Sequence, residues 1–148
     1  MALNSASDQY AISVRAAAES DFPSVARIQR EVPEAAQWPL GDYSGTPLLI
    51  AFLGAVPAGF CAWRQTASDE AEMLNLAVDP AHRRCGVASA LLRALSQAAS
   101  GALYLEVSEH NAPAIALYLS HGWSQTGLRK GYYHQGKIDA IVMKKTSW

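Results

Sequence analysis

Residues 78–88 read VDPAHRRCGVA. In this segment two adjacent arginines and a glycine follow the end of an apolar stretch. At Gly86 the apolar residues change from alternating to helical spacing. Backbone N–H groups at the start of a helix have no partner inside it and carry the positive end of its dipole, so they suit a phosphate. Gly86 and the small Ala88 would let a pyrophosphate approach the backbone closely. These residues predict a phosphate site, although a plain turn with solvated arginines would explain them equally well.

The same stretch differs from two common phosphate-binding motifs. Neither Gly-Lys-Ser nor Gly-Lys-Thr follows it, so it is not a P-loop. The three spaced glycines of a dinucleotide-binding turn are also missing. A single glycine in a turn is a weak signal, so other parts of the sequence must decide between the two interpretations.

The elements that would position these residues form an irregular series of strands and helices. Alternating apolar residues predict strands at 12–15, 48–53, 58–64, 71–78 and 103–107, and two more on either side of residues 133–136. Helical spacing predicts three helices, with Ser20 or Asp21 as the first cap, a start near Gly86 for the second, and Asn111 as the third cap. Residues 33–43 are predicted as a loop or a short further helix, and Gly122 as a C′ glycine. This order predicts an α+β fold with a mixed sheet flanked by helices.

Length and composition favour one domain, residues 1–148, with a loose N-terminal tail of about ten residues. The net charge of −1 argues against nucleic acid or a membrane as a partner. Cys61 and Cys85 lie far apart and no secretory segment precedes them, so we expect a reduced cytoplasm rather than a disulfide framework. The four histidines show no metal-ligand spacing, and we expect no metal site.

Several motifs together resemble the GNAT superfamily, whose acetyl-CoA loop reads Arg/Gln-x-x-Gly-x-Gly/Ala. That pattern falls here on Arg83, Gly86 and Ala88. Within the superfamily the chain is similar to the RimI-type ribosomal-protein alanine N-acetyltransferases. The motifs that carry this likeness are LNLAVDP at 74–80, LYLEV at 103–107, NAPAIALY at 111–118, GYY at 131–133 and DAIVM at 139–143. The likeness runs from about residue 71 to residue 144, whereas the first third of the chain matches only in general organisation.

The resemblance implies acetyl-CoA as co-substrate. In the family, a strand backbone bonds the pantetheine arm and polarises the thioester carbonyl, and a loop cradles the pyrophosphate with its amides. A further polar residue contacts the cofactor's arm. The residues implied for this site are Leu76, Ala77, Val78, Arg83, Arg84, Cys85, Gly86, Val87, Ala88, Ser89 and Asn111. Alanine at 88 and cysteine at 85 depart from the commoner family residues, but neither change removes a backbone N–H.

The resemblance also implies the acid and the base. Attack of an amine on a thioester needs the ammonium deprotonated and the departing thiolate protonated, and the family's glutamate and tyrosine match Glu106 and Tyr118. A phenol, with a reference pKa near 10, can serve as the proton donor. From their patterns alone, Glu106 would be a solvated strand carboxylate and Tyr118 a core aromatic.

Three aromatic residues are candidates for binding the acceptor. Tyr132 and Tyr133 match a hairpin that, in relatives, lines the entrance for a peptide N-terminus, and Trp38 could form the opposite wall or simply pack. The resemblance implies the terminal amine of a protein as acceptor, by family analogy the N-terminal alanine of a small-subunit ribosomal protein. Two alternatives stay open, a GNAT enzyme acting on a small amine or a lysine side chain, and a non-catalytic acyl-CoA-binding module. The presence of Glu106 and Tyr118 weighs against the module.

Overall fold

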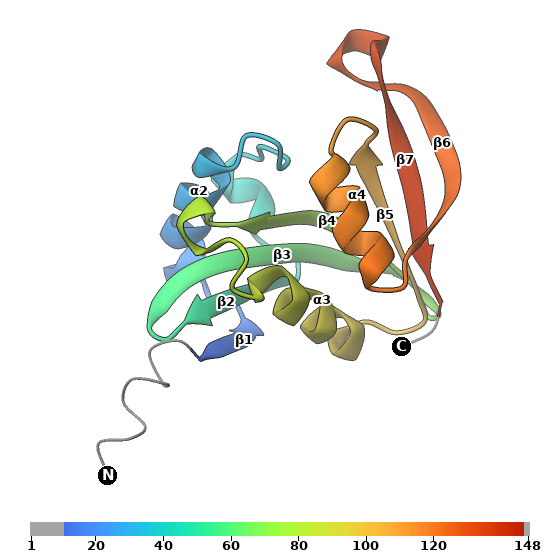
Figure 1. Cartoon of the computed structure of the whole chain (residues 1–148). Helices are drawn as coiled ribbons and strands as arrows, with labels where there is room; N and C mark the ends of the chain where they lie inside the picture. Colours follow the sequence, from blue (N-terminus) through green and yellow to red (C-terminus); the bar gives the residue numbers. More distant parts are fainter. Residues whose placement is uncertain (1–10, 147–148) are drawn as a thin grey trace. The chain divides into compact units, whose positions relative to one another are not determined.

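The computed structural model describes residues 11–146, which form seven strands, three α-helices and four short 3-10 segments (Figure 1). The strands are β1 (Ile12–Ala16), β2 (Leu48–Leu53), β3 (Val56–Ala67), β4 (Glu70–Val78), β5 (Ala102–Ser108), β6 (Ser124–Tyr133) and β7 (Ile138–Lys145). The helices are α2 (Phe22–Glu31), α3 (Val87–Ala98) and α4 (Ala112–Ser120). The 3-10 segments are η2 (Glu19–Asp21), η3 (Leu40–Tyr43), η4 (Pro80–His82) and η5 (His134–Gly136). The predicted tail lies outside the described residues.

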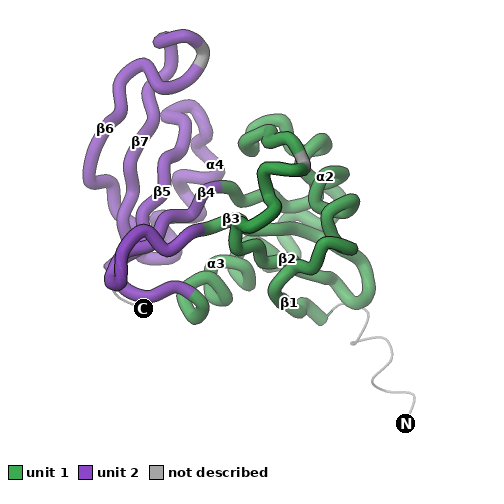
Figure 2. Tube along the Cα trace, turned by 180° about the vertical axis from the view of Figure 1, so that it is seen from behind, with its two compact units in different colours: residues 1–63, 75–98 green, residues 64–74, 99–148 purple. Residues whose placement is uncertain are grey.

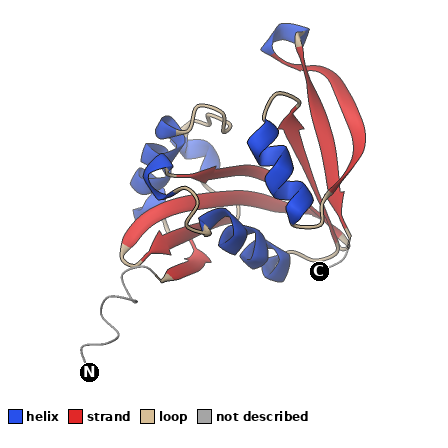
Figure 3. Ribbon diagram, in the orientation of Figure 1, coloured by secondary structure: helices blue, strands red, loops and turns tan. Residues whose placement is uncertain are grey.

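Within residues 11–146 the strands form one seven-stranded sheet in the order β1-β2-β3-β4-β5-β7-β6. Strands β4 and β5 pair in parallel, whereas β1–β2, β2–β3, β5–β7 and β6–β7 pair antiparallel. The parallel pair needs a crossover, which α3 supplies, and α4 joins β5 to β6 (Figure 3). The mixed sheet with helices confirms the predicted α+β class.

The described residues divide into two compact units (Figure 2). Unit 1 takes residues 11–63 and 75–98, and unit 2 takes residues 64–74 and 99–146. The chain passes between the units three times, inside strand β3, inside strand β4 and at the end of helix α3. No helix among residues 11–146 is long and apolar enough to cross a membrane.

In unit 1 a glycine lets helix α3 lie close to the sheet. A Cβ at Gly59 of β3 would stand 2.8 Å from the carbonyl oxygen of Ala77 and 3.0 Å from Cγ1 of Val87. Any side chain at this position would therefore push α3 away from the strands. The next residue, Phe60, points to the other face, where its ring meets the edge of Tyr43 at 5.8 Å. Helix α3 and the η3 segment thus lie on opposite faces of β3.

A buried polar network fixes the irregular segment between α2 and β2. The side-chain amide of Asn75 on β4 donates to the carbonyl of Ala36 at 2.9 Å and to the hydroxyl of Tyr43 at 3.0 Å. Tyr43 donates to Gln29 of α2, and Gln29 donates in turn to the carbonyl of Trp38 at 2.7 Å. Buried polar groups need such partners. The segment is a loop that ends in one short 3-10 turn, in agreement with the prediction for residues 33–43.

Unit 2 is built around strand β5, whose side chains alternate between two environments. Leu103 and Leu105 are buried, whereas Tyr104 and Glu106 lie on the other, half-buried face. Tyr104 lies under the ammonium of Lys144, 5.2 Å from the ring centroid. The predicted placement of Glu106 on the face opposite its apolar neighbours is therefore confirmed.

Two local predictions were right only in part. Asp21 stands at the N-cap position of α2, but its carboxylate makes no cap bond, because it accepts instead from Ala18 N–H at 2.8 Å and from Arg15 at 2.7 Å. The strand predicted at 58–64 extends from Val56 to Ala67, so it includes Pro57, which is tolerated beside an irregularity in the pairing with β2. The cap by Asn111 is confirmed, and so is the C′ position of Gly122, with φ of 88°.

Candidate active site

The turn after β4 is anchored by Asp79. Its carboxylate accepts from the N–H of Ala81 at 3.0 Å and from the guanidinium of Arg27 on α2 at 2.9 Å, and its side chain is only 7% exposed. Burial raises the pKa of Asp79, but the hydrogen bonds from Arg27 and Ala81 outweigh it, so this pKa lies below its usual value. An ionised, buried carboxylate therefore fixes where the loop begins.

The loop between β4 and α3, residues 79–86, contains two residues with left-handed backbone conformations. These are Arg84 and Gly86, with φ of 62° and 88°. A positive φ is uncommon outside glycine and often marks a functional site. Turns that contain such residues form concavities of N–H groups that bind anions. A Cβ at Gly86 would meet only Ile12 Cδ1, at 3.5 Å. Position 86 therefore requires the backbone freedom of glycine rather than room among neighbouring residues.

Helix α3 begins directly after this turn. The N–H of Ala90 donates to the carbonyl of Gly86 at 3.0 Å, which makes the first bond of the helix and confirms the predicted start near Gly86. The N–H groups of Val87 and Ala88 precede that bond, so they have no acceptor inside the helix. The side chain of Val87 is buried and packs toward Gly59, which holds the first turn of the helix in place. The helix start and the turn together can bind a phosphate.

The charged side chains of the loop are at the surface. The guanidinium of Arg83 pairs with Glu34 at 2.9 Å, and both side chains are about half exposed, at 50% and 46%. Pairs of this kind contribute little to stability, so Arg83 can exchange Glu34 for a phosphate at small cost. Arg84 and Cys85 are exposed as well, and the thiol of Cys85 approaches the carbonyl of Arg83 at 3.6 Å.

The remaining predicted cofactor residues of unit 1 lie at the end of β4. The parallel pairing of β4 with β5 joins residues 70–72 to residues 102–104, and Leu76, Ala77 and Val78 lie beyond it. Ala77 is buried, whereas Leu76 and Val78 are half-buried. The other predicted cofactor residue, Asn111, belongs to unit 2.

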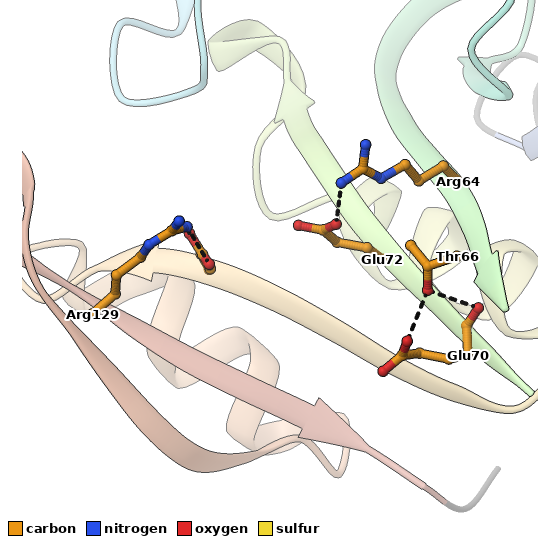
Figure 4. Close-up of polar contacts among 6 residues, drawn as sticks. Arg64, Thr66, Glu70, Glu72 and Arg129 are labelled. Atoms are coloured by element: carbon orange, nitrogen blue, oxygen red, sulfur yellow. Dashed lines mark hydrogen bonds and ion pairs between the residues drawn. The ribbon is translucent and has the colours of Figure 1, made fainter.

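In unit 2, Glu106 carries an ion pair that the sequence did not reveal. Nη1 of Arg129 on β6 donates to Oε1 of Glu106 at 2.8 Å and to Oε2 at 3.0 Å (Figure 4). The same guanidinium lies over the ring of Tyr132, 4.6 Å from its centroid. The Glu106 side chain is 24% exposed and that of Arg129 is 56% exposed. Glu106 is therefore a partly buried, paired carboxylate, which differs from the solvated carboxylate that its pattern alone suggested.

The two predicted acceptor tyrosines lie beside this ion pair. They end strand β6, and their rings meet edge to face with centroids 4.8 Å apart. Tyr132 is 48% exposed and Tyr133 is half-buried. Burial raises the pKa of Tyr133, and the charges of Tyr132 and Glu106 raise it further. The structure therefore brings together Glu106 and both tyrosines, with Arg129 among them.

Helix α4 and its N-cap residue supply the two other predicted residues of unit 2, Tyr118 and Asn111. Tyr118 is buried and packs against Trp123, with ring centroids 5.9 Å apart. The side-chain oxygen of Asn111 accepts from the N–H of Ala114 at 3.3 Å. The packing of Tyr118 agrees with the core aromatic that its pattern suggested, and its role as proton donor stays a prediction. So does the contact of Asn111 with the cofactor.

The third predicted acceptor residue, Trp38, belongs to unit 1. Its ring stacks on Tyr43 at 5.1 Å with an angle of 26° between the planes. This contact agrees with the packing interpretation, and the role of an acceptor wall stays a prediction. Among the described residues, no group of three or more His, Cys, Asp or Glu side chains is placed to hold a metal ion.

Sequence reasoning missed Arg27, the partner of Asp79 in unit 1, and Arg129, the partner of Glu106 in unit 2. Arg27 meets Asp79 across 52 positions of the chain, and Arg129 meets Glu106 across 23. The second contact depends on β7, which pairs with both β5 and β6. The order of those three strands carried no local signal in the sequence.

A model of the acetyltransferase (GNAT) family matches residues 12–123. The ribosomal protein bS18-alanine N-acetyltransferase of Escherichia coli K12 is 42% identical over 85 residues, 53% of this chain and 57% of that protein. The N-alpha-acetyltransferase RimI of Mycobacterium tuberculosis is 40% identical over 91 residues, 61% of this chain and 58% of that protein. The chain thus spans a little over half the length of these two relatives. The crystal structure of the ribosomal-protein-S18-alanine N-acetyltransferase from Escherichia coli matches with a TM-score of 0.79 and 29% identity, over 92% of this chain and 94% of that one.

Proposed function

Because the chain belongs to the acetyltransferase (GNAT) family, we propose that it transfers an acetyl group from acetyl-CoA to the N-terminal amine of a protein. The proposed acceptor is the N-terminal alanine of a small-subunit ribosomal protein, by analogy with the substrate named for the Escherichia coli relative. A ribosomal acceptor would place the enzyme in the cytoplasm, and the free thiols of Cys61 and Cys85 agree with a reducing compartment.

The loop of unit 1 supports the binding of acetyl-CoA. The left-handed residues Arg84 and Gly86 and the first-turn amides of α3 fit a pyrophosphate, which needs several N–H donors at close range. The backbone of Leu76, Ala77 and Val78 would hold the pantetheine arm, because these residues lie beyond the pairing of β4 with β5. Arg83 and Arg84 would add positive charge near the phosphates. The thioester of acetyl-CoA supplies the acetyl group.

Glu106 and Tyr118 would handle the protons. Glu106 accepts one proton from the acceptor's ammonium, directly or through water, and releases it to solvent. The neutral amine then forms the new C–N bond as the C–S bond breaks, and its nitrogen passes a second proton to Glu106. Tyr118 donates its phenolic proton to the departing thiolate. The products are an N-acetylated terminus, the free thiol of CoA and one proton released to solvent, and the second proton, held by Glu106, can pass through solvent to restore Tyr118.

We choose a terminal amine as acceptor because the partly buried carboxylate of Glu106 lies beside Tyr132 and Tyr133. A terminal amine has a reference pKa of about 7.7–8.0 and a lysine side chain about 10.4. Near neutral pH lysine therefore costs roughly 3.4 kcal/mol more to deprotonate. A single carboxylate can serve a terminal amine more easily, and two tyrosines suit the first residues of an extended peptide.

The test is thiol release from acetyl-CoA with three acceptors. These are a peptide with a free alanine terminus, the same peptide with a blocked terminus and an internal lysine, and a simple diamine. We expect the free-terminus peptide to have the highest kcat/KM. Preference for the lysine peptide or the diamine would instead identify the small-amine or lysine enzyme. Tight binding of acetyl-CoA without release for any acceptor would identify a non-catalytic acyl-CoA-binding module.

A further inference from the structure

Arg129 occupies the side of Glu106 that a second cation would need. One guanidinium nitrogen bonds both carboxylate oxygens, at 2.8 and 3.0 Å. A primary ammonium approaching Glu106 would compete for the same oxygens, since it recognises a carboxylate through the same kind of N–H···O bonds. Glu106 therefore cannot offer both oxygens to the acceptor's ammonium while Arg129 is bound to them.

The Arg129 pair is suited to exchange. The Arg129 side chain is 56% exposed, and pairs this open are weak because water screens them. Arg129 also has a second contact, the face of Tyr132 at 4.6 Å, which a guanidinium can keep after it leaves a carboxylate. A nearby negative charge on Glu72 favours the cation as well. When the guanidinium of Arg129 leaves Glu106, it therefore keeps the Tyr132 ring and the charge of Glu72 as favourable neighbours.

A neighbouring ion pair of unit 2 shows what a plain surface pair looks like. Arg64 on β3 bonds Glu72 on β4 at 2.9 Å, with side chains 59% and 30% exposed (Figure 4). Its geometry and exposure resemble those of the Arg129 pair. The difference is the surroundings, because only the Arg129 pair includes the proposed catalytic base and touches a proposed acceptor residue, Tyr132.

We propose that Arg129 is a positioning residue that holds the place of the acceptor's ammonium on Glu106, and that acceptor binding exchanges one cation for the other. This inference rests on the proposed function. The exchange keeps the charge at Glu106 balanced throughout, so the carboxylate is never left buried and unpaired. It also favours acceptors that carry a cationic amine, because a neutral group cannot replace the guanidinium. After the exchange, Glu106 has its oxygens on the group that must lose a proton.

The test compares the KM for a free-terminus alanine peptide in four proteins: wild type, Arg129→Gln, Arg129→Lys and Arg64→Gln. Removal of the competing cation in Arg129→Gln should lower this KM by roughly two- to fivefold, the strength of an exposed pair. Arg129→Lys keeps a cation on Glu106 and should return the KM toward the wild-type value. Arg64→Gln leaves both ions of the Arg129 pair in place, and although it frees Glu72 to attract Arg129, it should change the KM by less than Arg129→Gln does.

Two further measurements separate exchange from a general effect of charge. Methylguanidinium should compete with the peptide in Arg129→Gln and raise its KM back toward that of wild type. A peptide that lacks its terminal amine, measured as an inhibitor, should bind equally well to wild type and to Arg129→Gln. The proposal is overturned by a raised or unchanged KM in Arg129→Gln, or by an equal fall in Arg64→Gln. Turnover of the peptide by wild type tests the proposed function separately. If wild type prefers a small amine, the KM for that amine in the same variants still tests the exchange.

Discussion

The loop of unit 1 presents backbone groups to its proposed ligand, whereas the cluster of unit 2 presents side chains. Around Gly86 the arrangement depends on two positive φ angles and the first turn of α3, and its arginines are at the surface. Around Glu106 it depends on side chains from two different strands, which meet through the pairing of β5, β7 and β6.

This difference predicts how the two regions respond to substitution. A site made of backbone groups should tolerate changed side chains and fail when the backbone cannot take its conformation. A site made of side chains should fail when one functional group is removed, even if the fold is kept. Four substitutions test the contrast.

The largest effect is expected in unit 2, for Tyr118→Phe. Phenylalanine keeps the ring that packs on Trp123 and deletes only the hydroxyl. If Tyr118 protonates the thiolate, kcat should fall by roughly 10²- to 10⁴-fold. Steady-state kinetics give kcat, and calorimetry should show nearly unchanged acetyl-CoA affinity. Turnover close to wild type in the folded variant would make Tyr118 a packing residue and leave the proton to water.

The next effect is expected in unit 1, for Gly86→Asp. The φ of 88° strains any residue with a Cβ, and a carboxylate would repel the pyrophosphate. Acetyl-CoA affinity should fall by at least ~1.4 kcal/mol, a factor of about ten, as measured by calorimetry. Gly86→Ala is the matched control because it adds the strain without the charge, and it should weaken binding less. Equal affinity in wild type and Gly86→Asp would remove the loop from the binding site.

The same contrast explains what the sequence could reveal. The turn at Gly86, the start of α3 and the cap at Asn111 depend on neighbours a few positions away, so residue type and spacing were enough to predict them. The alternation that places Glu106 opposite its apolar neighbours is local in the same way. The contact of Glu106 with Arg129 is not local, because β7 follows β6 in the chain yet lies between β6 and β5 in the sheet. Asp21 stands at the predicted N-cap position but makes no cap bond for a local reason, because Arg15 and the N–H of Ala18 compete for its carboxylate.

A smaller effect is expected for the anchor of the loop, in Asp79→Asn. Asparagine keeps an acceptor for Ala81 but loses the charge that Arg27 pairs with, so the free energy of unfolding at neutral pH should fall by about 1 kcal/mol. The folded-state pKa of Asp79 lies below its usual value of 3.8. Its contribution is therefore complete above about pH 4 and is lost as the pH falls through the folded-state pKa.

Urea titrations at several pH values test this sign. Between about pH 5 and about pH 2, wild type should lose more stability than Asp79→Asn, because only wild type must protonate this buried carboxylate. The two proteins should thus converge at low pH. A constant difference across the whole range would mean that Asp79 is not the group whose ionisation stabilises the turn.

The smallest effect is expected for Arg83→Gln, which removes a charge from the loop without touching its backbone. Arg83 is half exposed and paired with Glu34, so its net contribution to acetyl-CoA binding should stay below about 1 kcal/mol, or about fivefold in Kd. Glu34→Gln is the matched partner variant, because it frees Arg83 and should tighten binding slightly. Both effects should shrink as salt rises, since exposed charges are screened. A loss in Arg83→Gln as large as that in Gly86→Asp would show that side-chain charge, rather than the backbone of the turn, holds the phosphates, and the contrast between the two regions would fail.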